Sequence, residues 1–330
     1  MVFRIKYHIF INYILYIYNV LFDHMKKKIL VIIGARGIGD LIYHLPLLRS
    51  LYLTYGQKLI ILSNKVNQSK EVFKNESFFE KIIEFDNYRY GILKTLINII
   101  KFKKLINSLN VNYLVLTANY RRLILPVLLS NVKEKKIFGT GLFKINKDRT
   151  LDHLTISERL LKYTHKLNLK KKVNNFFLTP KNLKTSRNVK SKKIFISVDS
   201  HHDQNNWPIQ NYLIIINKLI KKNNVFVNFA PNKKYFLKYF SHNLIHSKKI
   251  TFTYKKKISE IIKIISQSDV IIGNESGPVC LGSSLKKKVH AIYLPIHTKP
   301  ESKIIYKKNN YYNAKKLSPK MIINKIFKSI

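Results

Sequence analysis

The feature that most constrains the fold is an alternation between short runs rich in β-branched residues and longer segments with helical periodicity. The runs 28–33 (KILVII) and 58–63 (KLIILS) flank residues 40–53, whose leucines recur on one helical face. Such runs indicate buried strands, and strands that alternate with helices are typical of βαβ units. The sequence therefore predicts an α/β protein with parallel sheets, in which Pro46 kinks the first helix or starts a new turn.

Two α/β series are present, which predicts two doubly wound, Rossmann-like domains that face a central cleft. A later strand at 112–118 and a helix at 150–168 belong to the first series, and a polar stretch typical of a linker follows. We expect an apolar N-terminal extension (1–24), a first domain (25–170), a linker (171–192) and a second domain (193–330). The second series is expected to contain strands at 193–199, 224–230, 269–273 and 289–295 and helices at 211–222, 258–268 and from Ser318 onward.

The chain is strongly basic, with 61 Lys and Arg residues against 17 Asp and Glu residues and a formal net charge of +44. A polyanionic partner would explain this excess, and so would the Lys-rich and Asn-rich composition that an AT-rich genome imposes. Nucleic acid is not expected as a partner, because no nucleic-acid-binding motif is visible. Cys280 is the single cysteine, so no intrachain disulfide can form.

Residues 8–22 form an apolar run after Arg4 and Lys6 that resembles a signal anchor. The run is shorter than the ~17–25 residues of a membrane-spanning helix, and it lacks a small-residue cleavage site. Three interpretations stay open, in decreasing order of preference: a dispensable extension with Met25 as the natural start, a membrane-associating helix, and a cleaved secretory signal.

A glycine-rich turn follows the first predicted strand and ends in a carboxylate: Gly34-Ala-Arg36-Gly37-Ile-Gly39-Asp40. Glycines allow a tight turn and a close approach of the backbone to a ligand. The spacing is near the dinucleotide fingerprint, but a carboxylate at the helix start opposes a pyrophosphate there. The second strand also ends without an acidic residue to hold a ribose. Asp40 is therefore either an ordinary first-turn acid that favours the helix dipole or a general base.

A second turn follows the predicted strand 269–273, with the sequence Asn274-Glu275-Ser276-Gly277-Pro278-Val279-Cys280. A strand, a Gly/Ser/Pro turn and a helix start form an anion site from backbone N–H groups and the helix dipole, which suits a nucleotide diphosphate. The same residues fit an ordinary βα turn with Ser276 as N-cap and Pro278 in the first helical turn. Both interpretations can hold together.

Adjacent histidines, His201 and His202, precede a Trp207-Pro208 helix start. Neighbouring residues point apart, and Asp203 alone does not complete a coordination set, so no metal site is predicted.

Taken in order, these segments resemble glycosyltransferase family 9, the lipopolysaccharide heptosyltransferases. The family opens with a strand, a glycine turn ending in Gly-Asp and a helix carrying Leu-Pro and Leu-Arg, here GARGIGDLIYHLPLLRSL. The later family segments correspond to DHLTISERLLKYTHKLNL near the domain junction, NNWP at a helix start, and IGNESGPVCLGSSL. The resemblance covers residues 25–310.

The resemblance implies a GT-B fold and an inverting, metal-independent transfer of a sugar (heptose) from a nucleotide-sugar donor, ADP-heptose, to a lipid-linked, lipopolysaccharide-type glycan, without a cofactor. Asp40 would be the general base. The first domain would bind the acceptor, through Arg36, Arg121 and Arg122, and the second domain would bind the donor, through Asn205 and residues 274–280. The protein would be cytoplasmic, and its basic surface would contact anionic lipid at the inner face of the inner membrane.

Four positions depart from the family pattern: Glu275 replaces an aspartate, Cys280 a histidine, Asn205 a lysine and Lys286 a glycine. Because neither cysteine nor asparagine brings a stable positive charge to a phosphate, the altered donor turn also fits a non-catalytic relative that binds a glycan or a nucleotide. A nicotinamide-dependent oxidoreductase is a third interpretation, which the missing ribose acid disfavours.

Overall fold

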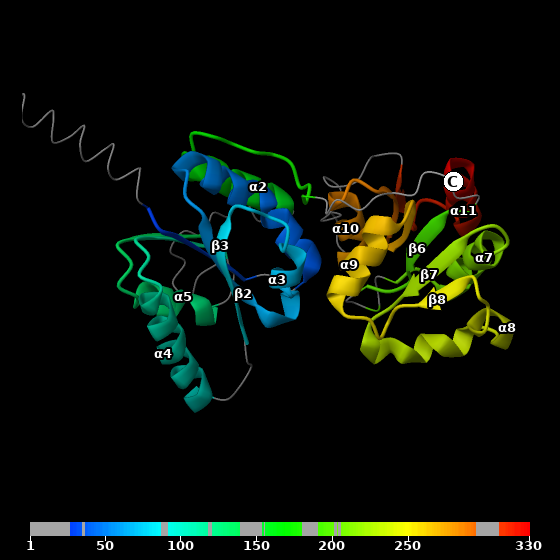
Figure 1. Cartoon of the computed structure of the whole chain (residues 1–330), viewed down its shortest axis with the longest axis horizontal. Helices are drawn as coiled ribbons and strands as arrows, with labels where there is room; N and C mark the ends of the chain where they lie inside the picture. The colour runs from blue at the N-terminus through cyan, green and yellow to red at the C-terminus, as the bar shows by residue number, and fades with distance from the viewer. Residues whose placement is uncertain are drawn as a thin grey trace, which may run out of the picture.

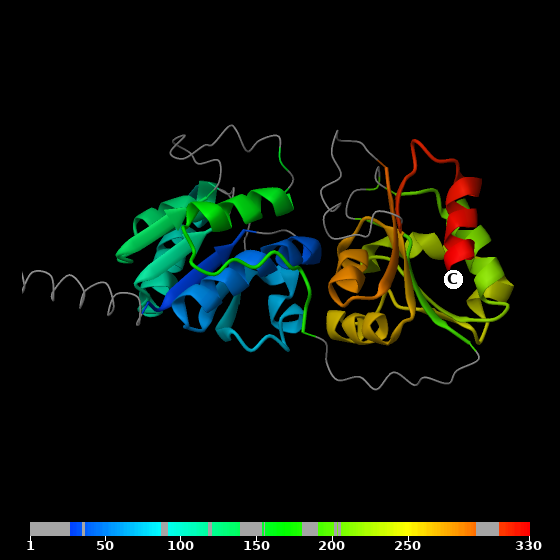
Figure 2. The same ribbon diagram turned by 90° about the horizontal axis from the view of Figure 1, so that it is seen from above.

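The computed structural model of the chain describes residues 27–34, 37–86, 92–117, 121–138, 154, 156–179, 191–200, 203, 206–294 and 310–330. The chain forms two domains that lie side by side, the first drawn from blue to green and the second from green to red (Figures 1 and 2). The predicted N-terminal extension falls outside the described residues. Within them, no helix combines the length and the apolar character that crossing a membrane requires.

The first domain is built on five strands: β1 (Ile29–Ile33), β2 (Leu59–Asn64), β3 (Phe79–Phe85), β4 (Tyr113–Leu116) and β5 (Glu134–Ile137). They form one sheet in the order β3-β2-β1-β4-β5, and every neighbouring pair is parallel. Its helices are α2 (Ile38–Tyr55), the short η1 (Lys65–Asn67) and α3 (Ser69–Val72), α4 (Ile92–Ser108), α5 (Arg121–Leu128) and α6 (Ile156–Lys166). Apolar side chains of α2 and α6 pack on one face of the sheet, and those of α4 and α5 pack on the other.

The second domain contains β6 (Lys193–Ser197), β7 (Asn224–Asn228), β8 (Ile250–Phe252), β9 (Val270–Asn274), β10 (Lys288–Tyr293) and β11 (Tyr311–Asn313). These strands form a parallel sheet in the order β11-β10-β9-β6-β7-β8. Its helices are α7 (Ile209–Leu219), η4 (Pro231–Tyr239), α8 (His242–Ile245), α9 (Ile258–Gln267), α10 (Gly277–Ser284) and α11 (Pro319–Ser329). Helices α9 and α10 cover one face, and α7 and α11 cover the other.

Strand β1 shows why the apolar runs lack a polar alternation. All five of its residues are fully buried. Ile29, Val31 and Ile33 contact the face covered by α2, whereas Leu30 and Ile32 contact the face covered by α4 and α5. In a parallel sheet with helices on both sides, neither face of a central strand reaches water. The α/β fold with two parallel sheets, predicted from these runs, is confirmed.

Helix α2 is longer than the sequence pattern predicts. It begins at Ile38 and runs through Pro46 to Tyr55 as one helix, so the proline does not start a new helix. The Ser50 hydroxyl donates to the Pro46 carbonyl oxygen at 2.7 Å. Gly56 then adopts a left-handed φ of 65° and donates its N–H to the Tyr52 carbonyl oxygen, which is the glycine cap that ends many helices.

The start of the predicted linker lies against both domains. The Thr179 N–H donates to Glu76 Oε1 at 2.6 Å, and Arg49 pairs with Glu76 Oε2 at 3.1 Å, which holds the segment to the first domain. The neighbouring Leu178 N–H donates to the Ser284 carbonyl oxygen at the end of α10, at 2.9 Å. Residues 171–179 therefore connect the domains as an ordered strap, and residues 180–190 lie outside the described part of the chain.

A close approach of β6 to β9 depends on a glycine. Gly273 lies opposite Ser197 in the parallel pair. A Cβ at Gly273 would stand 2.4 Å from the Ser197 carbonyl oxygen and 3.0 Å from a methyl group of Val279. A side chain at this position would therefore push the two strands apart.

We expect Gly273→Ala to lower the free energy of unfolding by about 1–3 kcal/mol, because the added methyl group meets backbone that cannot yield locally. Gly39→Ala is the matched control, since a Cβ at Gly39 would meet its nearest neighbour at 3.7 Å, an ordinary contact. Urea denaturation followed by circular dichroism measures both variants. Equal stabilities for the two variants would show that β6 and β9 can separate without cost.

His290 is a buried histidine that joins β10 to two other elements. Its Nδ1 lies 2.8 Å from the Tyr312 hydroxyl in β11, and its Nε2 lies 2.9 Å from the Ser329 hydroxyl in α11. Burial, followed by the nearby charge of Lys288, lowers the pKa of His290 to about 4. The imidazole is thus neutral in the folded protein at neutral pH and serves the packing of the second domain.

The lowered pKa of His290 predicts a loss of stability on acidification. Between pH 6.5 and about 4 the unfolded chain takes up a proton at this histidine and the folded protein does not, so unfolding becomes easier as the pH falls. Across this pH range, protonation of the unfolded chain at His290 lowers the free energy of unfolding by about 3 kcal/mol. Urea denaturation at several pH values should show a shallower pH dependence for His290→Gln than for the unmodified chain, and parallel curves would refute this assignment.

Candidate functional site

Each sheet has a point where the order of its strands reverses. In the first sheet the reversal lies between β1 and β4, and in the second it lies between β6 and β9. Ligands of open parallel sheets bind beyond the carboxyl ends of the strands at such points, because the following loops diverge there. Gly34 and the start of α2 follow β1, and Thr117 follows β4. The glycine turn identified in the sequence therefore lies at the first of these points.

Asp40 lies in the first turn of α2, which Gly37 caps in an extended conformation. The Oδ2 atom of Asp40 accepts the Gly37 N–H at 3.2 Å. This bond satisfies one of the amide groups that the start of a helix leaves without an intrahelical acceptor, and it orients the carboxylate at the positive end of the helix. The first-turn role proposed for Asp40 is thus present, and it is compatible with a role in catalysis.

His44 fixes the first turn of α2 against β4. Its Nδ1 lies 2.6 Å from the Asp40 carbonyl oxygen, and its Nε2 lies 2.8 Å from the Thr117 hydroxyl. Burial lowers the pKa of His44 against the opposing effect of Asp40, so the ring is neutral and carries one N–H. A carbonyl oxygen can only accept, so Nδ1 donates to the Asp40 carbonyl oxygen and Nε2 is an acceptor. The single hydrogen of the Thr117 hydroxyl is shared between Nε2 and the Ile32 carbonyl oxygen, which lies 3.1 Å away.

The second point of reversal carries the predicted anion-binding turn. Ser276 is the N-cap of α10, and its hydroxyl lies 3.3 Å from the hydroxyl of Ser197 at the end of β6. Pro278 occupies the first turn and has no N–H. The amides of Gly277 and Val279 are the donors that the start of this helix offers. Together with the helix dipole they form an anion site.

Asn274 holds the loop that follows β6. Its buried side-chain oxygen accepts the Trp207 N–H at 2.8 Å and the Tyr212 hydroxyl at 3.0 Å. Its side-chain nitrogen donates to the Val198 carbonyl oxygen at 2.8 Å. Trp207 itself is buried. The asparagine that ends β9 therefore fixes both Val198, at the end of β6, and Trp207, before α7, next to the start of α10.

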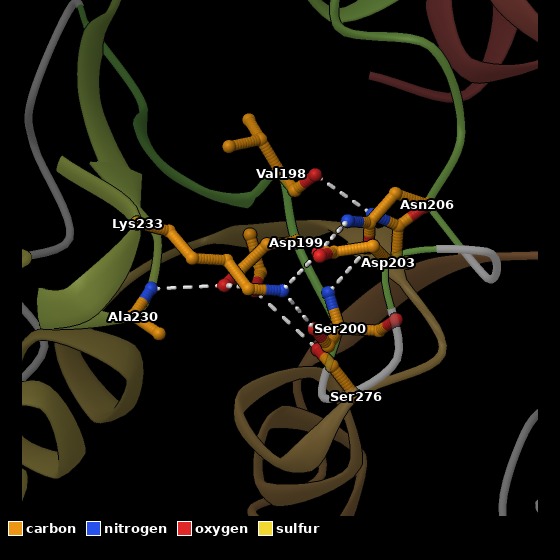
Figure 3. Close-up of polar contacts among 10 residues, drawn as sticks. Val198, Asp199, Ser200, Asp203, Asn206, Ala230, Lys233 and Ser276 are labelled. Atoms are coloured by element: carbon orange, nitrogen blue, oxygen red, sulfur yellow. Dashed lines mark hydrogen bonds and ion pairs between the residues drawn. The ribbon is translucent and has the colours of Figure 1, made fainter. Parts of the chain in front are cut away.

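The carboxyl ends of β6, β7 and β9 meet around a polar cluster (Figure 3). Buried Asp199 accepts the Ala230 N–H at 2.9 Å, and the Ser200 N–H donates to Asn206 at 2.6 Å. Burial raises the pKa of Asp199, and its hydrogen bond and the charge of Lys233 oppose this effect. The long side chain of Lys233 reaches from the start of η4 into the same cluster.

The two turns predicted from the sequence touch each other across the domain junction. A Cβ at Gly277 would lie 3.2 Å from the Cβ of Ile38, and a Cβ at Gly39 would lie 3.7 Å from the sulfur of Cys280. The first turns of α2 and α10 are therefore in van der Waals contact. Asp40 follows Gly39 directly, so the candidate base and the anion-binding turn belong to one site.

The other predicted residues have different positions. Val279 is buried against Gly273, Glu275 accepts the Tyr311 hydroxyl at 2.9 Å, and Gly34 directly follows β1. Arg36 and Asn205 lie outside the described residues, as do the side chains of Arg121 and Arg122 at the start of α5. In the ranges that the structure describes, no three His, Cys, Asp or Glu residues are grouped so that they could hold a metal ion. Metal independence stays a prediction.

Sequence reasoning missed three polar residues of the site: His44, Thr117 and Lys233. A signal existed, because Thr117 and Lys233 follow strands of parallel sheets and His44 lies one helical turn after Asp40. The sequence could not show which of the adjacent Lys233 and Lys234 is buried, since that depends on the path of η4.

Comparisons with known proteins agree with this architecture. The family model described as "Glycosyltransferase family 9 (heptosyltransferase)" matches residues 140–327. No curated protein sequence matches the chain significantly.

Several solved structures share the fold. The glycosyl transferase family 9 structure from Veillonella parvula DSM 2008 aligns with a TM-score of 0.72 at 12% identity, over 92% of this chain and 97% of that chain. The structure of E. coli heptosyltransferase WaaC with ADP aligns with a TM-score of 0.70 at 13% identity, over 92% of this chain and 100% of that chain. The structure of E. coli ADP-heptose LPS heptosyltransferase II aligns with a TM-score of 0.69 at 14% identity, over 91% of this chain and 98% of that chain. The expected GT-B architecture is thereby confirmed. Because the family match spans more than half of the sequence, the chain belongs to glycosyltransferase family 9, the heptosyltransferase family, and is a glycosyltransferase.

Proposed function

We propose that this chain transfers a sugar from a nucleoside-diphosphate sugar to a hydroxyl group of a glycan, with inversion at the anomeric carbon and without a metal. The observation that carries this proposal is the contact between the first turns of α2 and α10. Asp40 lies in the first of these turns, and the amides that suit a diphosphate lie in the second. A direct displacement at one carbon requires a base and an anion site that belong to the same site.

Asp40 acts as the general base in this mechanism. Its carboxylate accepts the proton of the acceptor hydroxyl while the acceptor oxygen attacks the anomeric carbon. The bond to the nucleoside diphosphate breaks on the opposite face, so one displacement inverts the configuration. The hydrogen bond from Gly37 keeps the carboxylate oriented, and His44 keeps the helix start in place.

The α10 turn stabilises the leaving group. Negative charge grows on the diphosphate as the glycosidic bond breaks, and the N–H groups of Gly277 and Val279 together with the positive end of α10 meet that charge. These donors are backbone groups held by the packing of α10 on β9, so they need no reorganisation during the reaction. Because this stabilisation comes from backbone groups, it does not need the histidine that the family pattern has at the position of Cys280.

ADP-heptose is the donor that we propose. Among the structures that share this fold, E. coli WaaC binds ADP in one and ADP-2-deoxy-2-fluoro heptose in another. The proposed acceptor is a lipid-linked, lipopolysaccharide-type glycan presented at the cytoplasmic face of the inner membrane. The net charge of +44 supports this setting, because basic residues near an anionic leaflet each contribute attraction of about 1 kcal/mol.

We expect Asp40→Asn to lower the rate of sugar transfer by about 10²–10⁴-fold, since the amide cannot accept the acceptor proton. The substitution preserves size, and its oxygen can still accept the Gly37 N–H, so the variant should lose at most about 1 kcal/mol of stability from the missing charge at the helix start and should still bind ADP. Transfer is measured as labelled sugar incorporated into glycolipid, and ADP binding by calorimetry.

Glu260→Gln is the matched control for the helix-start role of the carboxylate. Glu260 accepts the Lys257 N–H at 3.0 Å at the start of α9, as Asp40 accepts that of Gly37 in α2. This variant should transfer sugar at the unmodified rate. Loss of a general base typically lowers the rate at least about 100-fold. If Asp40→Asn retains more than about a tenth of the activity, Asp40 is therefore a structural carboxylate and the base lies elsewhere.

A further inference from the structure

The loops at the second point of strand reversal contain no basic side chain of the kind that usually meets a diphosphate. Residues 199–206 and residues 274–280 include neither lysine nor arginine. A diphosphate brings at least two negative charges, and backbone N–H groups with a helix dipole balance them in part. A cation that serves this site must therefore come from another segment.

Lys233 is such a cation. It lies near the start of η4, in the loop after β7, and it is 7% exposed, although lysine is almost never buried without a partner. Its Nζ donates to the Ser200 carbonyl oxygen at 2.7 Å and pairs with Asp203 Oδ1 at 2.6 Å. Figure 3 shows the ammonium pointing into the cluster between the β6 loop and Ser276.

The two carboxylates near Lys233 are unequal partners. Asp199 is buried, its nearer oxygen lies 3.9 Å from the ammonium, and it is already bonded to the Ala230 N–H. Asp203 makes the shorter contact, yet its side chain is 71% exposed. An ion pair to such an exposed carboxylate contributes little stability. Asp203 can therefore leave Lys233 at small cost, whereas Asp199 remains in place as part of the buried cluster.

We propose that Lys233 contacts the diphosphate of the donor, and that Asp203 holds the ammonium as a replaceable anion while the donor is absent. This inference rests on the proposed function and adds the cation of the donor site. Binding exchanges one exposed carboxylate for a phosphate of higher charge. The Ser200 carbonyl oxygen accepts from the ammonium at 2.7 Å and can remain its partner throughout the exchange.

Calorimetric titration of the full chain with ADP tests this exchange in three variants. Asp203→Asn removes the competing anion and should tighten ADP binding about two- to fivefold. Lys233→Met removes the cation and should weaken ADP binding about 10- to 100-fold. Lys234→Met is the matched control, because Lys234 is the exposed neighbour on the same turn, and it should bind ADP as the unmodified chain does.

The Asp203→Asn variant separates this inference from a purely structural role of Lys233. If Lys233 has only a structural role, loss of its partner loosens the contact between Lys233 and Asp203, and ADP affinity falls or stays the same. Either result overturns the inference, even where Lys233→Met fails to fold. If the unmodified chain binds no ADP, UDP, GDP or CDP, the proposed function falls together with it. ADP binding without a gain in Asp203→Asn overturns the role of Lys233 alone.

Discussion

The packing of one helix start against another is the contact on which the site depends. The first turns of α2 and α10 meet at Gly277, where a side chain would press on Ile38, and at Gly39, which faces Cys280. Both helix starts carry positive partial charge, so their approach is electrostatically unfavourable by itself. The carboxylate of Asp40 offsets part of this charge, and an anionic ligand would offset more. The junction is thus preorganised for negative charge.

Apolar packing holds these two turns together. One buried cluster contains residues of α2, such as Leu41 and Leu45, and residues of α10, such as Val279 and Leu281. Leu178 of the strap between the domains belongs to the same cluster. Each buried leucine or valine stabilises the contact by ~1.5–3 kcal/mol, whereas the interaction of a charge with a helix dipole is ~1 kcal/mol. The apolar packing therefore outweighs the repulsion between the two helix starts. Side chains away from the reacting groups therefore set the separation of base and anion site.

The few acidic residues of this basic chain have specific positions. With 17 acids against 61 bases, basic residues outnumber acidic residues by more than three to one. Glu76 nevertheless binds both Arg49 and the strap between the domains, and Asp199 lies buried beneath Lys233. The excess of lysines agrees with an anionic partner. The role of an individual lysine depends on whether its side chain is buried or exposed. Lys233 is buried in the second domain, and Lys234 beside it is exposed.

The sequence by itself determined the two parallel sheets and indicated the two turns of the candidate site. These features depend on local rules: β-branched runs form buried strands, glycines permit tight turns, and Ser-Gly-Pro begins a helix. The match to the family rested on the same segments. Short edge strands such as β5 and β11 were missed, because a few residues at the edge of a sheet lack a clear pattern.

Only the tertiary structure decided which distant residues share the site. Asp40 and Ser276 are far apart in the sequence, and their proximity follows from the packing of α2 on α10. His44 meets Thr117 because β1 and β4 are neighbours in the sheet, and Lys233 reaches the β6 loop because β7 lies beside β6. Contacts between segments distant along the chain arise from the order of strands and the closure of the domains, and neither is encoded in any one local pattern.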